Sequence, residues 1–121
     1  QRQMDIRDRC ATCSDQADGY ARGEGCGTVV LKPLSESLEK NLWGVIKGTA
    51  VNQDGRSANL TSPNGPSQEA VMLKALDRAR IVPEEIDYLE SHGTGTSLGD
   101  PQEVQAIRNV HRNRQNYLVV G

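Results

Sequence analysis

One segment of this chain has residue types that could do chemistry. It consists of a histidine followed by alternating glycines and threonines. Residues 90–101 read Glu-Ser-His-Gly-Thr-Gly-Thr-Ser-Leu-Gly-Asp-Pro, with His92 directly after a short apolar run. An imidazole can donate a hydrogen bond or move a proton near neutral pH, and the hydroxyls of Thr94 and Thr96 can bind a polar, uncharged ligand. The glycines between them let backbone approach such a ligand closely. The sequence therefore predicts a site in this loop, with His92 as its candidate catalytic residue.

A strand and a helix are expected to hold this loop. The apolar run over 86–90 predicts a strand that leads into the loop, and ligands of α/β proteins tend to bind beyond the carboxyl ends of strands. A helix is expected from Asp100, because Pro101 suits a first turn and Asp100 and Glu103 have the spacing of a capping box. The side chains expected to form its buried stripe are Val104, Ile107 and Val110.

The rest of the chain alternates between strand-like and helix-like patterns. Apolar runs over 28–31 and 43–51 predict two strands, the first buried on both faces and the second able to pair with it in antiparallel fashion. A long polar loop over 52–66 has a length usually tied to function. A helix over 66–79 and a last strand over 117–121 follow. The order strand, strand, helix, strand, helix, strand predicts an α/β layered fold in which helices pack on a sheet.

Composition narrows the function classes. The chain has 121 residues with no Phe, one Trp and three Tyr, so its core is thin for an independent domain. A formal net charge of −2 argues against nucleic-acid binding. No apolar run approaches the ~20 residues of a membrane span. Three cysteines and no visible signal peptide favour a reducing, cytoplasmic setting, with organellar targeting further upstream left open.

Four motifs carry a resemblance to a known family, and they stand in its order and spacing. They are residues 17–27 (Ala-Asp-Gly-Tyr-Ala-Arg-Gly-Glu-Gly-Cys-Gly), 50–57 (Ala-Val-Asn-Gln-Asp-Gly-Arg-Ser), 60–66 (Leu-Thr-Ser-Pro-Asn-Gly-Pro) and 92–101. With them the chain resembles the ketosynthase (β-ketoacyl synthase) domain of type I polyketide synthases, which has a thiolase-like condensing-enzyme fold. The Asn-Gln-Asp-Gly stretch at 52–55 is more similar to polyketide synthases than to animal fatty-acid synthases.

The resemblance implies an acyltransferase that performs a decarboxylative Claisen condensation between a Cys-bound acyl group and malonyl-phosphopantetheine. His92 matches a catalytic histidine that donates a hydrogen bond to the malonyl thioester oxygen. Such a donor, aimed at a developing oxyanion, stabilises the transition state more than the ground state. Thr94 and Thr96 match threonines that line the phosphopantetheine tunnel, and Thr61 matches a third hydroxyl near the same arm.

The same resemblance implies the partners. The phosphopantetheine arm is supplied by an acyl carrier protein domain, so no cofactor is expected to bind directly and no metal is needed. Acyl and malonyl thioesters are the expected substrates. A homodimer of the parent is expected, with neither nucleic acid nor a membrane span.

The resemblance also implies that the chain spans the boundary between two halves of a ketosynthase and lacks some of its catalytic residues. Residues 1–42 match the end of the N-terminal half of the ketosynthase, and residues 43–121 match the start of its C-terminal half. The nucleophilic Cys is expected upstream of Gln1, and the second histidine with a lysine downstream of Gly121, so we interpret the chain as an excerpt that is inactive alone. Cys13 is not the expected nucleophile, because no helix start is visible around it to lower the pKa of a thiol.

One departure from the family falls at the end of the helix expected over 66–79. Arg80 stands where glycine is usual, at a position that favours a left-handed backbone, and this could cost about 1 kcal/mol. The apolar face expected for this helix consists of Met72, Ala75, Leu76 and Ala79.

Three other interpretations stay open. A non-elongating ketosynthase-like domain, acting as a carrier-protein-binding or dimerisation module, would carry the same motifs. The Gly-Thr-Gly-Thr stretch at 93–96 could cradle a phosphate, but no lysine stands in the right place. Cys10, Cys13 and Cys26 could bind zinc with a histidine, but a second Cys pair is lacking. A small, buried Cys26 is the simpler expectation.

Overall fold

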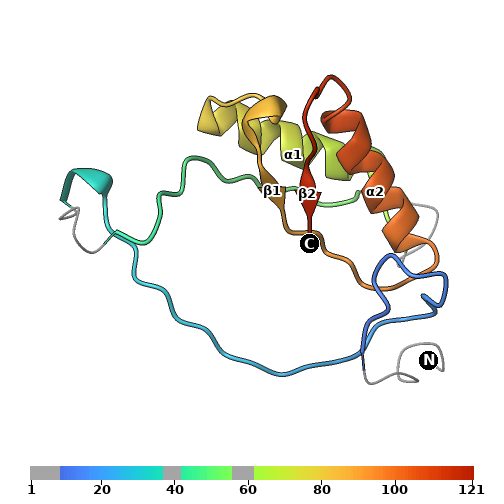
Figure 1. The fold of residues 1–121 in the computed structure, drawn as a ribbon. Coiled ribbons are helices and arrows are strands. Elements are labelled where there is room, and N and C mark those ends of the chain that lie inside the picture. The colour runs from blue at the N-terminus through green and yellow to red at the C-terminus, as the bar shows by residue number, and fades with distance from the viewer. Residues whose placement is uncertain (1–8, 37–41, 56–61) are drawn as a thin grey trace.

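The computed structural model describes residues 9–36, 42–55 and 62–121. Its elements follow in the order η1 (Leu34–Glu36), α1 (Gly65–Ala79), η3 (Pro83–Glu85), β1 (Tyr88–Leu89), α2 (Gly99–Val110) and β2 (Val119–Val120). Helices α1 and α2 pack against each other and lie beside the two strands in Figure 1, whereas residues 20–33 run away from them as a long open arc. The arrangement is α/β, and within the described part of the chain the packed helices and paired strands lie in residues 62–121.

The two strands form a parallel pair. Tyr88 lies opposite Val119 and Leu89 opposite Val120. The amide of Gly121 donates to the Leu89 carbonyl oxygen over 3.0 Å, which continues the ladder to the end of the chain. The strands expected over 86–90 and 117–121 are therefore present, each with two residues in regular pairing.

Arg114 connects the entrances of both strands. Its guanidinium donates to the Ile86 carbonyl oxygen just before β1 and, over 3.0 Å, to the Tyr117 carbonyl oxygen just before β2. It also donates over 3.0 Å to the carbonyl oxygen of Glu84 in η3. The Arg114 side chain is only 7% exposed. Because one rigid guanidinium binds both strand entrances, it helps to set their register.

Helix α1 begins and ends as its sequence predicts. The Asn64 side chain accepts a hydrogen bond from the Ser67 amide over 3.2 Å, and Pro66 lies in the first turn. Arg80 ends the helix in the left-handed conformation, with φ 57° and ψ 43°. Its amide donates to the Asp77 carbonyl oxygen over 3.0 Å, as in a helix usually closed by glycine. The expected apolar face is half-buried at each of its positions: Met72, Ala75, Leu76 and Ala79.

Helix α2 confirms part of its expected buried stripe. Ile107 and Val110 are 7% and 9% exposed, but Val104 is 48% exposed and Ala106, at 1%, takes its place in the core. The stripe thus departs from the expected face at its N-terminal end. This region faces an open hollow instead of the helix pair, and Val104 lines that hollow.

The antiparallel hairpin expected from 28–31 and 43–51 is not present. Neither segment is assigned as a strand, and Val29 and Val30 are 82% and 84% exposed while Trp43 is fully exposed. A strand needs a partner edge for its amides and carbonyls, and among the described residues no strand lies beside 28–31. The expectation that Cys26 is buried is also wrong, because it lies exposed in the same open stretch.

Residues 48–54 lie along α1 and are held there by side chains. A Cβ at Gly48 would come within 2.6 Å of the Ala79 backbone nitrogen, so only glycine allows this approach. Asn52 donates to the Ser67 carbonyl oxygen over 2.7 Å, and the Ser67 hydroxyl donates to the Gln53 carbonyl oxygen over 3.0 Å. The first part of the expected 52–66 loop is therefore ordered on the helix; within that loop, residues 56–61 lie outside the described part of the chain.

Candidate active site

The histidine loop, which we define as residues 91–96, starts where β1 ends. The Ser91 amide and hydroxyl both donate to the Gly121 carbonyl oxygen, over 2.8 and 2.7 Å, so the loop is fastened to the end of β2. His92 follows with an exposed side chain. Gly93 and Gly95 have φ values of 51° and 76°, a left-handed backbone that glycine adopts without strain. His92 thus lies beyond the carboxyl end of a strand, as predicted, and that strand is paired in parallel.

Glu103 binds the backbone on both sides of the His92 carbonyl. Its Oε1 accepts from the His92 amide over 2.6 Å, and its Oε2 accepts from the Gly93 amide over 3.0 Å. Hydrogen bonds to a carboxylate are about twice as strong as neutral ones. Since both carboxylate oxygens are used, this side chain fixes the backbone from which the imidazole projects.

Asp100 binds the same loop further along. Its carboxylate is buried, with the residue 5% exposed. One oxygen accepts from the Gly95 amide over 3.0 Å, and the other accepts from the Cys13 amide over 2.8 Å. This carboxylate therefore joins the histidine loop to a segment that lies more than eighty residues earlier in the chain.

The capping box expected from Asp100 and Glu103 is wrong. Helix α2 begins at Gly99 with Leu98 at its N-cap, and the Leu98 side chain makes no capping hydrogen bond. Both carboxylates instead bind amides of the preceding loop. They remain near the positive end of the helix, where a negative charge is favoured. Asp100 directly follows Gly99, but no local pattern in the sequence indicates that these carboxylates bind the preceding loop.

Thr94 and Thr96 are half-buried and bind each other. Their hydroxyl oxygens are 3.2 Å apart, and the Thr96 hydroxyl also accepts from the Gly99 amide over 2.9 Å. Two hydroxyl hydrogens serve one mutual hydrogen bond, so one of them is left for another acceptor. Thr61, the third expected hydroxyl, lies outside the described residues.

A segment near the N-terminus closes over the histidine loop. In this clamp segment, which we define as residues 10–19, the Thr12 hydroxyl donates to the Gly93 carbonyl oxygen. The Gly19 amide donates to the Gly95 carbonyl oxygen over 3.0 Å. Cβ atoms at Gly93 and Gly95 would come within 2.5 Å of the Thr12 side chain and 2.8 Å of the Ala11 backbone. The two glycines thus admit the protein's own backbone, in addition to any ligand.

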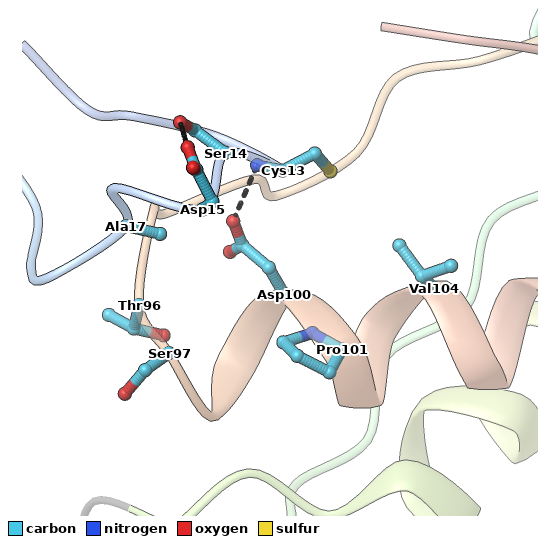
Figure 2. A pocket seen from close by; sticks show the side chains of 9 residues that line it. All are labelled: Cys13, Ser14, Asp15, Ala17, Thr96, Ser97, Asp100, Pro101 and Val104. Carbon is cyan, nitrogen blue, oxygen red and sulfur yellow. Dashed lines mark hydrogen bonds between the residues drawn. The ribbon is translucent and has the colours of Figure 1, made fainter.

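An open hollow of about 460 Å³ lies between the clamp segment and the start of α2. Figure 2 shows Asp100 at its centre, hydrogen-bonded to Cys13, with Thr96 and Pro101 on the helix side. The residues that line it are Cys13, Ser14, Asp15, Ala17, Thr96, Ser97, Asp100, Pro101 and Val104. Thr96 is the one predicted site residue among them. His92 and Thr94 lie in the same loop but outside the lining.

Two other groups bear on the chemistry of this region. The hydrogen bond from the Tyr88 hydroxyl to the Glu90 carboxylate raises the pKa of the exposed tyrosine above its usual value. All three cysteines are free and exposed. No group of three metal-ligating side chains occurs within the part of the chain that the structure describes.

Two family matches together account for nearly the whole chain. The β-ketoacyl synthase C-terminal domain matches residues 43–121, and the β-ketoacyl synthase N-terminal domain matches residues 1–37. The chain belongs to the β-ketoacyl synthase family. Its histidine loop, Asp100 and Glu103 all lie in the part matched by the C-terminal domain.

Individual relatives of the chain are polyketide synthases. Polyketide synthase GfsA of Streptomyces halstedii is 50% identical over 101 residues, which cover 82% of this chain and 1% of that protein. Polyketide synthase PksN of Bacillus subtilis is 45% identical over 106 residues, which cover 86% of this chain and 2% of that protein. The chain thus spans only a small part of the length of these relatives.

A solved structure gives the fold. The ketosynthase from module 6 of the bacillaene synthase of Bacillus subtilis superimposes with a TM-score of 0.86 and 34% identity, over 93% of this chain and 21% of that one. The chain therefore has part of the thiolase-like fold of ketosynthases, as its sequence predicts. No helix among its described residues is long and apolar enough to cross a membrane.

Proposed function

We propose that this chain is part of a polyketide synthase ketosynthase that catalyses decarboxylative Claisen condensation. Residues 1–42 belong to the end of its N-terminal half, and residues 43–121 to the start of its C-terminal half. The main observation behind the proposal is that the Glu103 carboxylate accepts hydrogen bonds from the His92 and Gly93 amides, just beyond the end of a parallel strand. A histidine placed so firmly, in a chain of this family, suits a reaction that needs a preorganised donor.

His92 is the residue that acts on the malonyl unit. Loss of carbon dioxide from malonyl thioester leaves an enolate whose negative charge gathers on the thioester oxygen. The imidazole N–H of His92 donates a hydrogen bond to that oxygen and lowers the energy of the enolate. The enolate carbon then attacks the acyl group on a cysteine, a carbon–carbon bond forms, and the cysteine thiolate leaves. The cysteine is supplied by another part of the synthase.

Thr94 and Thr96 fit the arm that carries the substrate. A phosphopantetheine arm contains amides and is supplied by an acyl carrier protein domain, which we propose as the partner. The Thr94–Thr96 pair has one hydroxyl hydrogen left over, and it can donate to an amide carbonyl of the arm. Thr61 is proposed to contact the same arm. We also propose that the parent synthase is a homodimer and that it works in a reducing compartment.

Replacing His92 by Ala in the complete synthase tests this function. We expect decarboxylation of malonyl thioester to fall roughly 10²–10³-fold, the usual loss on removing one oxyanion donor, while loading of the acyl group continues. Release of labelled carbon dioxide and mass spectrometry of the acyl-enzyme measure the two steps separately.

The control is His111→Ala, which removes the other histidine of the chain. His111 lies at the far end of α2, with its ring bound to the Pro83 carbonyl oxygen over 3.1 Å, so both steps should continue. If His92→Ala abolished acyl loading and spared decarboxylation, the role given to His92 would be wrong. A wild-type synthase that decarboxylates but never elongates would instead be a non-elongating domain.

A further inference from the structure

Two thiols in the clamp segment have no part in the proposed chemistry. Cys10 and Cys13 are separated by two residues, as in a C-x-x-C motif, and both are free and exposed to solvent. Cys10 Sγ accepts a hydrogen bond from the Ala21 amide over 3.3 Å. The chain reverses between the two thiols, because the Ser14 amide donates to the Ala11 carbonyl oxygen over 3.1 Å and Cys13 is left-handed with φ 54°.

The residues between and beside these thiols hold the histidine loop. Thr12, which lies between them, donates its hydroxyl to the Gly93 carbonyl oxygen. The Cys13 amide donates to Asp100, whose other oxygen holds the Gly95 amide. A covalent change at the two sulfurs therefore acts on a backbone that contacts residues next to His92.

We propose that Cys10 and Cys13 form a reversible dithiol–disulfide site that responds to a low-molecular-weight disulfide such as oxidised glutathione. One cysteine thiolate attacks the glutathione disulfide, forms a mixed disulfide and releases one glutathione. The second cysteine then attacks its partner's sulfur and releases the other glutathione. Two protein thiols lose two electrons and two protons, and one glutathione disulfide becomes two glutathione thiols, so the exchange balances.

The disulfide closes a small ring that contains Thr12. A sulfur–sulfur bond holds the two Cβ atoms about 3.5–4.5 Å apart, and we expect closure of this ring to draw the Cys10 sulfur from the Ala21 amide and to tighten the turn at 11–14. The Thr12 hydroxyl and the Cys13 amide then shift away from Gly93 and Asp100. Oxidation thereby loosens the clamp segment, and reduction restores it.

Peptide mapping tests the site directly. Trypsin, which cuts after arginine, releases residues 10–22 as one peptide that contains Cys10 and Cys13, whereas Cys26 falls in the next peptide. The full chain is equilibrated with reduced and oxidised glutathione in graded ratios, and free thiols are then alkylated. We expect the 10–22 peptide to convert from a doubly alkylated form to an unalkylated form that is two hydrogen atoms lighter than the free dithiol, and reductant added before alkylation to reverse this.

Single substitutions separate this site from ordinary thiol oxidation. Cys26→Ser should leave the conversion unchanged, whereas Cys10→Ser and Cys13→Ser should each abolish it. If each cysteine instead ended as a separate glutathione adduct, or if the peptide stayed reduced at every ratio, the dithiol site would be refuted.

Hydrogen exchange tests the link to the histidine loop. We expect the Cys13 amide, which donates to Asp100, and the Gly19 amide, which donates to Gly95, to exchange about fivefold faster after oxidation, since losing one hydrogen bond corresponds to about 1 kcal/mol. The Cys10→Ser variant, exposed to the same glutathione mixture, is the matched control and should show no change. A disulfide that forms without faster exchange would overturn the regulatory part. Neither readout needs condensing activity, so their failure is distinct from failure of the proposed function.

Discussion

At the scale of single residues, the main feature is that two carboxylates of one helix organise the loop of the candidate catalytic histidine. Glu103 accepts from the His92 and Gly93 amides, and Asp100 accepts from Gly95. These side chains need not touch a substrate to affect its reaction. By holding the backbone, they limit the directions in which the imidazole can point, and small misplacements of a donor have large effects on rate. They are positioning residues.

Glu103→Gln tests this at one position. An amide keeps one oxygen acceptor but turns an NH₂ group toward the second backbone amide, so one of the two hydrogen bonds is lost. We expect malonyl decarboxylation in the complete synthase to fall about tenfold to a hundredfold, because a hydrogen bond to a charged group contributes about 1.5–3 kcal/mol. The loss should appear in kcat more than in KM.

The matched control is Gln105→Ala on the same helix. The Gln105 side chain is exposed and donates a hydrogen bond to Asn109, away from the histidine loop. This substitution should leave decarboxylation unchanged. An equal fall in kcat for both variants, or a fall explained entirely by a lower melting temperature, would argue against a positioning role for Glu103.

At the scale of elements, one arginine ends helix α1 and another binds the backbone where β1 and β2 begin. Arg80 closes α1 in a left-handed conformation that other residues adopt less readily than glycine. Arg114 holds the entrances of β1 and β2 through backbone carbonyl oxygens, with its side chain almost fully buried. The first arginine strains its element, and the second stabilises a pair of elements.

Arg80→Gly should stabilise the protein. Removing the Cβ from a left-handed position gains about 1 kcal/mol, which should raise the midpoint of urea unfolding without changing its slope. Lys74→Gly, in the middle of the same helix and also exposed, is the opposite control and should destabilise by about 1 kcal/mol. An unchanged or lower midpoint for Arg80→Gly would show that its backbone is not strained.

Arg114→Lys should destabilise the protein. A lysine ammonium cannot reproduce the planar fork that reaches both strand entrances, and the loss of several buried hydrogen bonds should cost about 2 kcal/mol or more. Thermal unfolding measures this, and Arg112→Lys, an exposed change of the same kind, should be neutral. Equal effects of the two substitutions would contradict the part given to Arg114.

At the scale of the whole molecule, the chain has little core of its own. Among the described residues, the buried apolar side chains are Ala106, Ile107 and Val110. Val29, Val30 and Trp43 are exposed to solvent. The parallel strands are only two residues each. Burial of this extent contributes little against the conformational entropy of the chain.

The isolated 121-residue chain should therefore show no condensing activity. It offers one of the proposed catalytic residues, His92, and its relatives are far longer. Mass spectrometry of the products formed from acyl and malonyl thioesters measures this, with the complete synthase as the positive control. An elongated product from the purified chain would overturn the expectation.

The local features of the fold and of the histidine loop could be predicted from the sequence. The helices expected over 66–79 and from Asp100, and the strand before His92, follow from periodicity and proline patterns within a few residues, and the structure has both helices within one residue of those starts. The left-handed position of Arg80 follows from the family resemblance. The family followed from four motifs in order, and the family matches confirm it. These features could be predicted because neighbouring residues determine them.

The sequence by itself thus determined the helices, the site loop and the family, while the tertiary structure alone decided how distant segments meet. It shows Asp100 and Glu103 on the histidine loop instead of in a capping box, and Val29 and Trp43 exposed instead of paired. Thr12 contacts Gly93 across 81 positions of sequence. Such contacts depend on which surfaces the folded chain brings together, and no local pattern encodes a hydrogen bond between residues so far apart.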